Sequence, residues 1–198
     1  MTFFAISGLF ILVPFYLENV LGASPREVGL LIACAPLLLG LSAPVSGSIS
    51  DRIGPRRVLV FGLIILVGAY LMMQLLQPDS PMWMIMLVMA PAGLGMGIFQ
   101  SPNNSAVMGS ASQERLGVTS AMLTITRNTG QLTGIAVLGA VWALRVAHHH
   151  GATIDAQAAP TISQAAALRD VGVVNTVLVA IALGLSLWGL AEERRGVP

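Results

Sequence analysis

The sequence predicts an all-α membrane protein in which six transmembrane helices form one bundle, and two observations carry this prediction. Of its 198 residues, 55% are hydrophobic and only 10% are charged, whereas soluble domains carry about 25% charged residues. The apolar runs are also long enough to cross a hydrocarbon core of roughly 30 Å, which takes about 20 helical residues. The core of a soluble protein would instead show shorter runs, of about 5 to 14 residues, broken by frequent charges.

Six apolar runs qualify as spans, and we expect a helix for each. Backbone groups without a partner are too costly in lipid, and the runs lack the apolar and polar alternation of a barrel strand. The predicted spans lie near residues 2–21, 28–50, 58–76, 82–104, 117–144 and 171–191 of one bundle, 1–191, which a cytoplasmic tail, 192–198, follows. The first run has no basic leader and no cleavage site, so we interpret it as a span and not as a signal peptide.

Short turns connect the first span to the second and the third span to the fourth. In the first turn, Ser24 is expected to cap the next helix and Pro25 to be its first residue. The second turn covers residues 77–81 and contains two prolines and an aspartate.

The connection before the last span is longer, and we expect it to be an exposed loop from Val146 to Asp170, rich in Ala and interrupted by Pro160. Three consecutive histidines, 148–150, fall in this stretch. We expect them in solvent on the outer side, because no acidic or cysteine ligand is near them in sequence. A metal site or a pH sensor is the alternative.

Arginines in the short loops predict the orientation, because cytoplasmic loops carry the excess of basic residues. All ten basic residues are arginines. One side receives Arg52, Arg56, Arg57, Arg115, Arg194 and Arg195, and the other side receives Arg26, Arg145 and Arg169. The chain is therefore predicted to be a multi-pass protein of the cell (inner) membrane with both termini in the cytoplasm.

The most specific motif lies in the turn between the second and third spans, where residues 47–57 read GSISDRIGPRR. Gly47 and Gly54 permit a close helix approach and a sharp reversal of the chain. Asp51 can pair with a neighbouring arginine or lie at the positive N-terminal end of the next helix. The arginines within its reach are Arg52, Arg56 and Arg57. We expect a latch for one conformation here; a plain basic loop is the alternative.

Four polar residues share one face of the fifth span, because they are spaced at i, i+3, i+4 and i+7. They are Thr124, Arg127, Asn128 and Gln131. At about 1.5 Å per residue from Gly117, Arg127 lies roughly 15 Å deep, where an arginine costs at least about 2.5 kcal/mol. We expect this face to line a pathway through the bundle. The alternative is an Arg127 side chain that reaches back to the membrane surface.

Polar and small residues also mark the fourth span. Gln100, Asn103 and Asn104 close it on the cytoplasmic side, where they either border the inner mouth of the pathway or cap and hydrate the helix end. Two pairs of glycines spaced four residues apart predict close helix contacts. These pairs are Gly93 with Gly97, and Gly130 with Gly134.

Several classes of function are not supported by the sequence. The single cysteine, Cys34, excludes an intrachain disulfide and a cysteine metal cluster. The glycines at 93–97 are followed by no Gly-Lys-Ser/Thr, so a phosphate-binding loop is not predicted. No nucleophile triad or catalytic carboxylate pair can be assembled, and no polybasic patch is present. We therefore expect no enzymatic activity, no metal, no cofactor and no nucleic-acid partner.

Four stretches resemble a known family. Residues 47–57 resemble the G-x-L-x-D-R-x-G-[RK]-[RK] loop signature of the major facilitator superfamily, with Ile49 in place of Leu. Residues 14–22, 101–108 and 126–130 resemble the "PLYLQxVLG", "PNNSAxM" and "xRNxG" stretches of its fourteen-span drug:proton antiporters. Glu18 departs from the more usual Gln. The resemblance covers nearly the whole chain and corresponds to the last six of the fourteen spans.

The resemblance implies half of a major facilitator superfamily fold that takes part in secondary active efflux of amphipathic drugs or metabolites in exchange for protons. The implied partners are the lipid bilayer, the missing N-terminal half or a second chain, a small amphipathic substrate and protons. The proton-carrying acids of the family usually lie in that N-terminal half, and the missing leader before the first span favours truncation. The alternative is a non-transporting membrane scaffold or a truncated, inactive half-transporter.

Overall fold

The computed structural model describes residues 1–152 and 155–194, and every regular element in these ranges is helical. The elements are α1 (Thr2–Phe15), a π-helical turn η1 (Tyr16–Val20), α2 (Pro25–Ile53), α3 (Pro55–Met73), α4 (Trp83–Gly109), a 3-10 turn η2 (Gln113–Arg115), α5 (Leu116–His150) and α6 (Thr161–Arg194). Six helical stretches in the described part are long and apolar enough to cross a membrane. The predicted fold class is confirmed.

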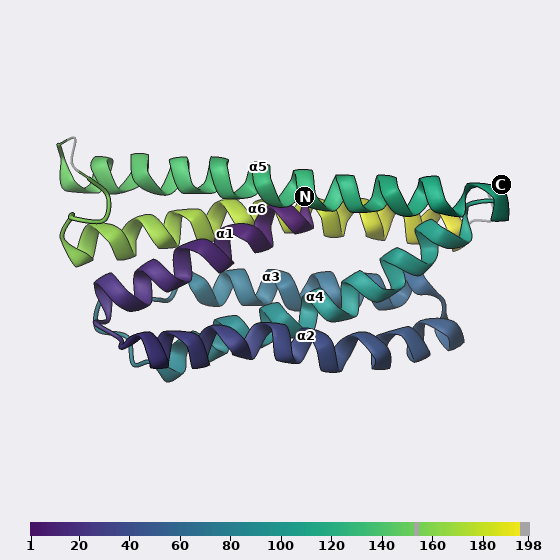
Figure 1. The fold of residues 1–198 in the computed structure, drawn as a ribbon, viewed down its shortest axis with the longest axis horizontal. Helices are drawn as coiled ribbons and strands as arrows, with labels where there is room; N and C mark the ends of the chain where they lie inside the picture. The colour runs from purple at the N-terminus through teal and green to yellow at the C-terminus, as the bar shows by residue number, and fades with distance from the viewer. Residues whose placement is uncertain (153–154, 195–198) are drawn as a thin grey trace.

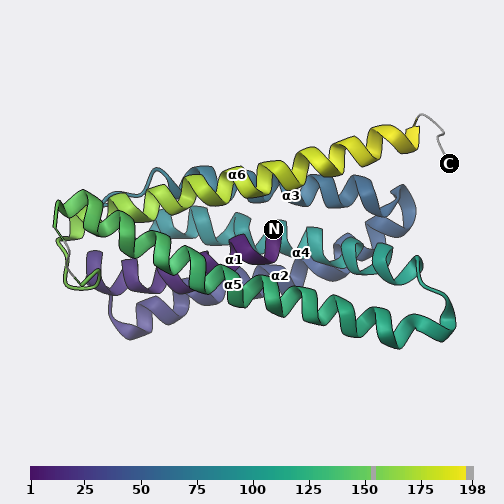
Figure 2. The ribbon, with the colours of Figure 1, turned by 90° about the horizontal axis from the view of Figure 1, so that it is seen from above.

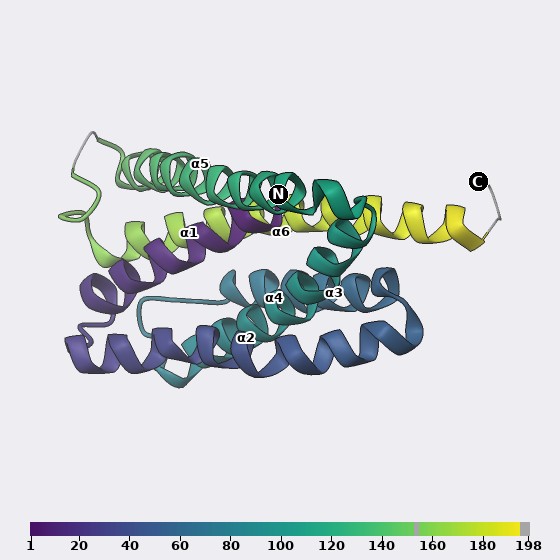
Figure 3. The same ribbon diagram turned by 45° about the vertical axis from the view of Figure 1, so that its right-hand side comes forward.

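The helices lie along one common axis in two groups of three (Figure 1). Helix α4 packs on α2 and α3, α5 packs on α1 and α6, and the contact between α3 and α6 joins the groups (Figure 3). In the most apolar 18-residue stretch of each helix, half of the residues are buried in α1 and in α4. In α2, α5 and α6, only about a fifth of the residues in this stretch are buried. Helices α1 and α4, followed by α3 with 44% buried, are therefore the most buried helices of the bundle, and α2, α5 and α6 leave wide apolar faces uncovered.

The turns before and after α2 form as their residues predict. The Ser24 hydroxyl accepts a hydrogen bond from the Glu27 backbone N–H, and the Glu27 carboxylate accepts one from the Ser24 backbone N–H at 2.8 Å. This reciprocal pair satisfies two backbone donors at the start of α2, so the predicted cap is confirmed. Gly54 adopts a positive φ of 91° between α2 and α3, a conformation that favours glycine.

Glycines set the closest contacts between helices. A Cβ atom at Gly93 would lie 2.7 Å from the Ala35 Cα of α2, and one at Gly97 would lie 2.6 Å from the Leu39 carbonyl oxygen. On α5, a Cβ atom at Gly134 would lie 2.9 Å from the Phe4 Cα of α1. Backbones approach this closely only where a side chain is missing. The predicted close contacts are confirmed at these three glycines.

The prediction of an exposed loop from Val146 to Asp170 is wrong. Helix α5 continues to His150, and α6 begins at Thr161, so the connection covers only 151–160. Alanine is the strongest helix former, and the three alanines 165–167 lie in the part of α6 that precedes the predicted span. Gly151 then ends α5 with a positive φ of 80°, the left-handed conformation usual at a helix C-terminus.

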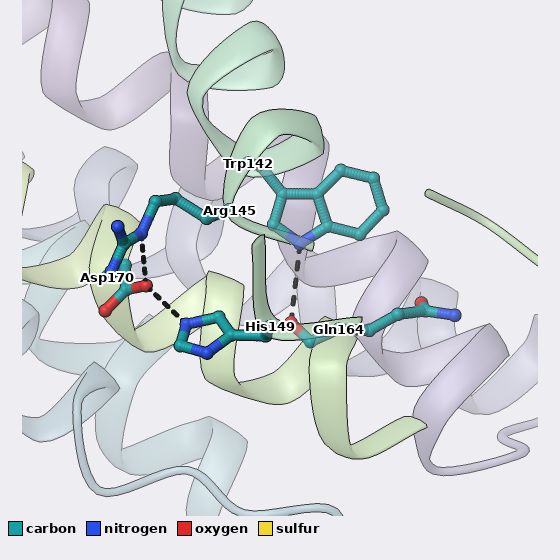
Figure 4. A network of polar contacts seen from close by, with 5 residues as sticks. All are labelled: Trp142, Arg145, His149, Gln164 and Asp170. Atoms are coloured by element: carbon teal, nitrogen blue, oxygen red, sulfur yellow. Dashed lines mark hydrogen bonds and ion pairs between the residues drawn. The ribbon is translucent and has the colours of Figure 1, made fainter. Parts of the chain in front are cut away.

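The histidines lie in the last turn of α5, where an acid from α6 reaches one of them (Figure 4). Asp170 Oδ2 accepts a hydrogen bond from Arg145 Nε at 2.6 Å and lies 2.8 Å from His149 Nε2. No acid is near the histidines in sequence, but the antiparallel arrangement of α5 and α6 brings Asp170, 21 positions away, to His149. Nearby, the Trp142 indole N–H donates to the Gln164 carbonyl oxygen at 3.4 Å. These contacts hold α5 and α6 together beside their connection.

Replacement of Gly93 by leucine is expected to destabilise the bundle, because the new side chain would meet the backbone of α2. Overpacking of this kind costs about 1–3 kcal/mol, so thermal unfolding in detergent should occur at a lower temperature. Gly139→Leu is the matched control, since no heavy atom lies within 4 Å of a Cβ atom there. Equal unfolding temperatures for the two variants would contradict the packing described for Gly93.

Removal of the Asp170 charge is expected to loosen the α5–α6 pair only slightly. The Arg145 and Asp170 side chains are 42% and 30% exposed, and exposed ion pairs contribute about 0.2–1 kcal/mol. A double-mutant cycle with Asp170→Asn and Arg145→Gln, followed by chemical unfolding in detergent, measures the coupling. Asp79→Asn serves as the control for the loss of a charge. If the effects of Asp170→Asn and Arg145→Gln on the free energy of unfolding are strictly additive, the ion pair contributes nothing to stability.

Candidate functional site

The polar face predicted on α5 is turned toward α1, where two hollows follow the seam between these helices. The first hollow has a volume of about 510 Å³. Ser7 and Phe10 of α1 line it on one side, and Asn128 and Gln131 of α5 line it on the other. The predicted pathway residues Asn128 and Gln131 therefore share one hollow with a hydroxyl group of the first helix.

The second hollow contains Arg127 and lies between α1, α4 and α5. Its volume is about 400 Å³, and Phe3, Asn103, Thr119 and Met122 are among the residues that line it together with Arg127. Helix α1 begins about midway along the bundle (Figures 1 and 2), which brings Phe3 to the level of Arg127. An arginine, an amide and hydroxyl groups thus meet apolar side chains in one small space.

The charge of Arg127 is only partly satisfied by its neighbours. Its guanidinium carbon lies 5.1 Å from the centre of the Phe3 ring, a distance typical of a cation–π contact. Its Nη2 donates one long hydrogen bond, 3.4 Å, to the Asn104 side-chain oxygen. Its Nε is buried without a hydrogen-bond partner in the described part of the chain. A buried donor without a partner is costly, so the guanidinium group of Arg127 is not fully compensated in this conformation.

The remaining pathway candidates are spread along α4 and α5. Asn104 accepts the hydrogen bond from Arg127, and Asn103 lines the second hollow, whereas Gln100 is half-buried and lines neither hollow. The Thr124 hydroxyl is exposed and donates to the Ser120 carbonyl oxygen at 3.0 Å. Of the seven predicted pathway residues, Thr124 and Gln100 therefore lie apart from the other five, which line a hollow or hydrogen-bond with Arg127.

The capping alternative for Gln100, Asn103 and Asn104 is wrong, because α4 continues to Gly109 and is followed by Ser110 at its C-cap. Membrane helices tolerate an internal proline, and the helix runs on past Pro102 through the residues 105–109. The three polar residues therefore lie inside a helix and not at its end.

The turn around Asp51 is formed, but its proposed latch is not closed in this conformation. Asp51 lies in the last turn of α2 and is exposed, and it pairs with none of the side chains that the structure describes. Arg56 instead reaches α6, where its Nη1 donates to the Gly189 carbonyl oxygen at 2.7 Å. A Cβ atom at Gly47 would lie 3.2 Å from the Ser101 hydroxyl of α4. The latch stays a prediction.

Sequence reasoning missed the contribution of α1 and one polar contact from α6. Phe3 and Ser7 line the two hollows, yet in an apolar run neither stands out. Asn175 is fully buried, and its side-chain N–H donates to the Ala5 carbonyl oxygen at 3.2 Å. An amide inside the apolar run 171–191 was the available signal for Asn175. The hydrogen bond of Asn175 fixes α6 to α1, the helix that carries Phe3 and Ser7.

Comparison of the sequence with known proteins finds relatives among membrane transporters. The chain is 33% identical over 132 residues to the riboflavin transporter RibZ of Clostridioides difficile, which is 67% of this chain and 29% of RibZ. It is 34% identical over 146 residues to the tetracenomycin C resistance and export protein of Streptomyces glaucescens, which is 74% of this chain and 27% of that protein.

A third relative is the multidrug transporter protein MdtP of Bacillus subtilis, 29% identical over 134 residues, which is 68% of this chain and 25% of MdtP. The chain therefore spans less than a third of each of these relatives. The family model for the Major Facilitator Superfamily matches residues 1–147 of the chain. Because this match covers well over half of the residues, the chain belongs to the Major Facilitator Superfamily.

Proposed function

We propose that this chain is the C-terminal six-span half of a fourteen-span exporter that moves amphipathic drugs or metabolites out of the cell in exchange for protons. The observation that carries the proposal is the partly satisfied Arg127, which lies with amide and hydroxyl groups in a hollow between α1, α4 and α5. A polar group of this kind inside a helix bundle is typical of a transport site. The names of two relatives, a multidrug transporter and an export protein, support the same class.

Transport requires a second bundle opposite this one. In secondary transporters, one half rocks against the other around a site near the middle of the membrane, and the six helices here form a single bundle. Large apolar side chains on α5 are uncovered, among them Met122 and Leu132, with exposed fractions of 64% and 68%. We propose that the surface beside the two hollows is covered by the N-terminal half of the transporter. This half belongs either to the same protein or to a second chain.

The linings of the hollows favour an amphipathic substrate. Ligand sites are mostly apolar with a few polar groups that set orientation. Here Phe10, Leu132 and Met122 provide apolar surface, while Gln131 and Arg127 provide hydrogen-bond donors. A hydrophobic molecule with one polar or anionic group matches this composition. Protons are the proposed coupling ion, and the acids that carry them belong to the opposing half.

The basic turns support a cytoplasmic position in the inner membrane for the end of the bundle at which α6 finishes, whereas the N-terminus lies about midway along the bundle (Figure 1). The α2–α3 turn and the α4–α5 turn lie at the same end of the bundle (Figure 1, right), and this end carries Arg52, Arg56, Arg57 and Arg115. Short cytoplasmic loops carry such an excess of arginine. The opposite end carries Arg26, Arg145 and Arg169. Substrate therefore enters from the end that holds the Asp51 turn.

A non-transporting scaffold or an inactive half-transporter is the second candidate. A scaffold needs the close helix contacts at Gly93 and Gly134, but it has no use for a partly satisfied arginine beside Asn104. Efflux of a fluorescent amphipathic dye from cells with and without a collapsed proton gradient separates the two functions. If the complete two-bundle protein inserts correctly and moves no dye, the scaffold is favoured.

Arg127→Ala is expected to lower dye efflux by the complete transporter about tenfold, which corresponds to the loss of one charge-assisted hydrogen bond of roughly 1.5 kcal/mol. Initial efflux rates from loaded cells, corrected for the amount of protein in the membrane, measure the effect. Arg115→Ala removes an exposed arginine from the α4–α5 turn and should leave efflux unchanged. Unchanged efflux by Arg127→Ala would contradict the role proposed for this residue.

A further inference from the structure

A separate apolar groove runs between α2 and α3, with α4 at its base and away from α1 and α5. Its volume is about 700 Å³. Leu41, Val45, Ile49 and Ile53 of α2 form one wall, because residues four apart lie on the same face of a helix, and Phe61 of α3 lies on the other wall. None of these residues belongs to either hollow beside α1.

Apart from Arg57 at one end, the groove offers hydrocarbon surface and no unsatisfied polar group. Leu41 is 70% exposed, Val45 59% and Phe61 57%, so no part of the described chain covers them. Two hydroxyl groups line the groove, and both have partners within the protein. The Ser46 hydroxyl hydrogen-bonds with the Ala43 carbonyl oxygen at 2.9 Å, and the Ser42 hydroxyl with the Leu39 carbonyl oxygen at 3.2 Å. An occupant therefore needs an apolar body.

One end of the groove is positively charged. Arg57, in the first turn of α3, lines the groove beside the reversal at Gly54 and forms no ion pair with any side chain that the structure describes. No carboxylate lines the groove. An anionic group placed at this end would lie at the membrane surface, where the helices turn back.

The length of the groove matches one leaflet of a bilayer. From Leu41 to Ile53 the wall on α2 covers twelve residue steps, or about 18 Å at about 1.5 Å per residue. One leaflet contributes roughly half of a hydrocarbon core of about 30 Å. A partner helix would cross the whole membrane, whereas this groove begins at the surface and ends near the middle.

We propose that this groove binds an anionic phospholipid of the leaflet beside the Asp51 turn, with one acyl chain along the α2 wall and the phosphate next to Arg57. Helices α2 and α3 pack on α4 more than on each other. The lipid chain fills the space between them and touches both. The site is distinct from the proposed transport site, and it does not depend on transport.

Lipid binding by the purified full chain in detergent tests the proposal. Native mass spectrometry compares phosphatidylglycerol with phosphatidylcholine of the same acyl chains, and glycerol phosphate serves as a headgroup without a chain. Phosphatidylglycerol is expected to bind more tightly than phosphatidylcholine, and glycerol phosphate is expected not to compete. Arg57→Gln should weaken phosphatidylglycerol binding about fivefold, the effect of one cation near an anionic lipid, and leave phosphatidylcholine unchanged. Arg115→Gln is the control and should change neither.

A second pair of variants tests the path of the acyl chain. Val45→Trp fills the groove and should weaken the binding of both lipids, whereas Leu30→Trp, at an exposed position of α2 outside the groove, should not. A phosphatidylglycerol with a photoreactive acyl chain should label the unaltered protein at groove residues, and this readout does not depend on the folding of a variant.

Four outcomes would overturn the proposal. They are equal affinity for the two lipids, competition by glycerol phosphate, labelling spread evenly over the exposed faces of α2, α5 and α6, and a dimer of the chain that Val45→Trp dissociates. The first and third would indicate ordinary solvation by lipid, the second a free phosphate site, and the fourth a second copy in the groove. Because no transport is measured, none of them bears on the proposed efflux function.

Discussion

The close approach of helix backbones at glycines is the constraint on which the rest of this structure depends. Lipid tails are as apolar as leucine, so helices in a membrane gain little from apolar contact alone and pack best where small residues let backbones meet. Gly93 and Gly97 bring α4 onto α2, and Gly134 brings α5 onto α1. With α1 and α4 held inside the bundle, Phe3 and Asn104 come to lie on two sides of Arg127.

The arginines show how differently one residue type is used in this fold. Arg145 pairs with Asp170, and Arg56 donates to a carbonyl oxygen of α6, so both join neighbouring helices. Arg127 has a phenyl ring and one long hydrogen bond, and Arg57 lies at the end of an apolar groove. The first two charges are used within the protein. The other two face spaces that a ligand or a lipid can fill.

The site was predictable on α5 and partly on α4, but not on α1. Asn128 and Gln131 stand out in an apolar run, and helical spacing puts them on the face that lines the first hollow. Phe3 carries no such signal, because a phenylalanine in an apolar span is ordinary. The contact between His149 and Asp170 was missed for a related reason. Its partners come from two helices, and only the extension of both helices brings them within 2.8 Å.

The sequence by itself determined that this is a membrane protein of six helices, that Ser24 caps α2, and that the chain reverses at Gly54. Each of these follows from local rules: the length of apolar runs, the hydrogen bonds of a helix end and the φ angles open to glycine. Only the tertiary structure decided which helices are inside, where Arg127 finds its neighbours, and that Asp51 is unpaired in the described part. Those features depend on distances between helices, and no periodicity within one helix contains them.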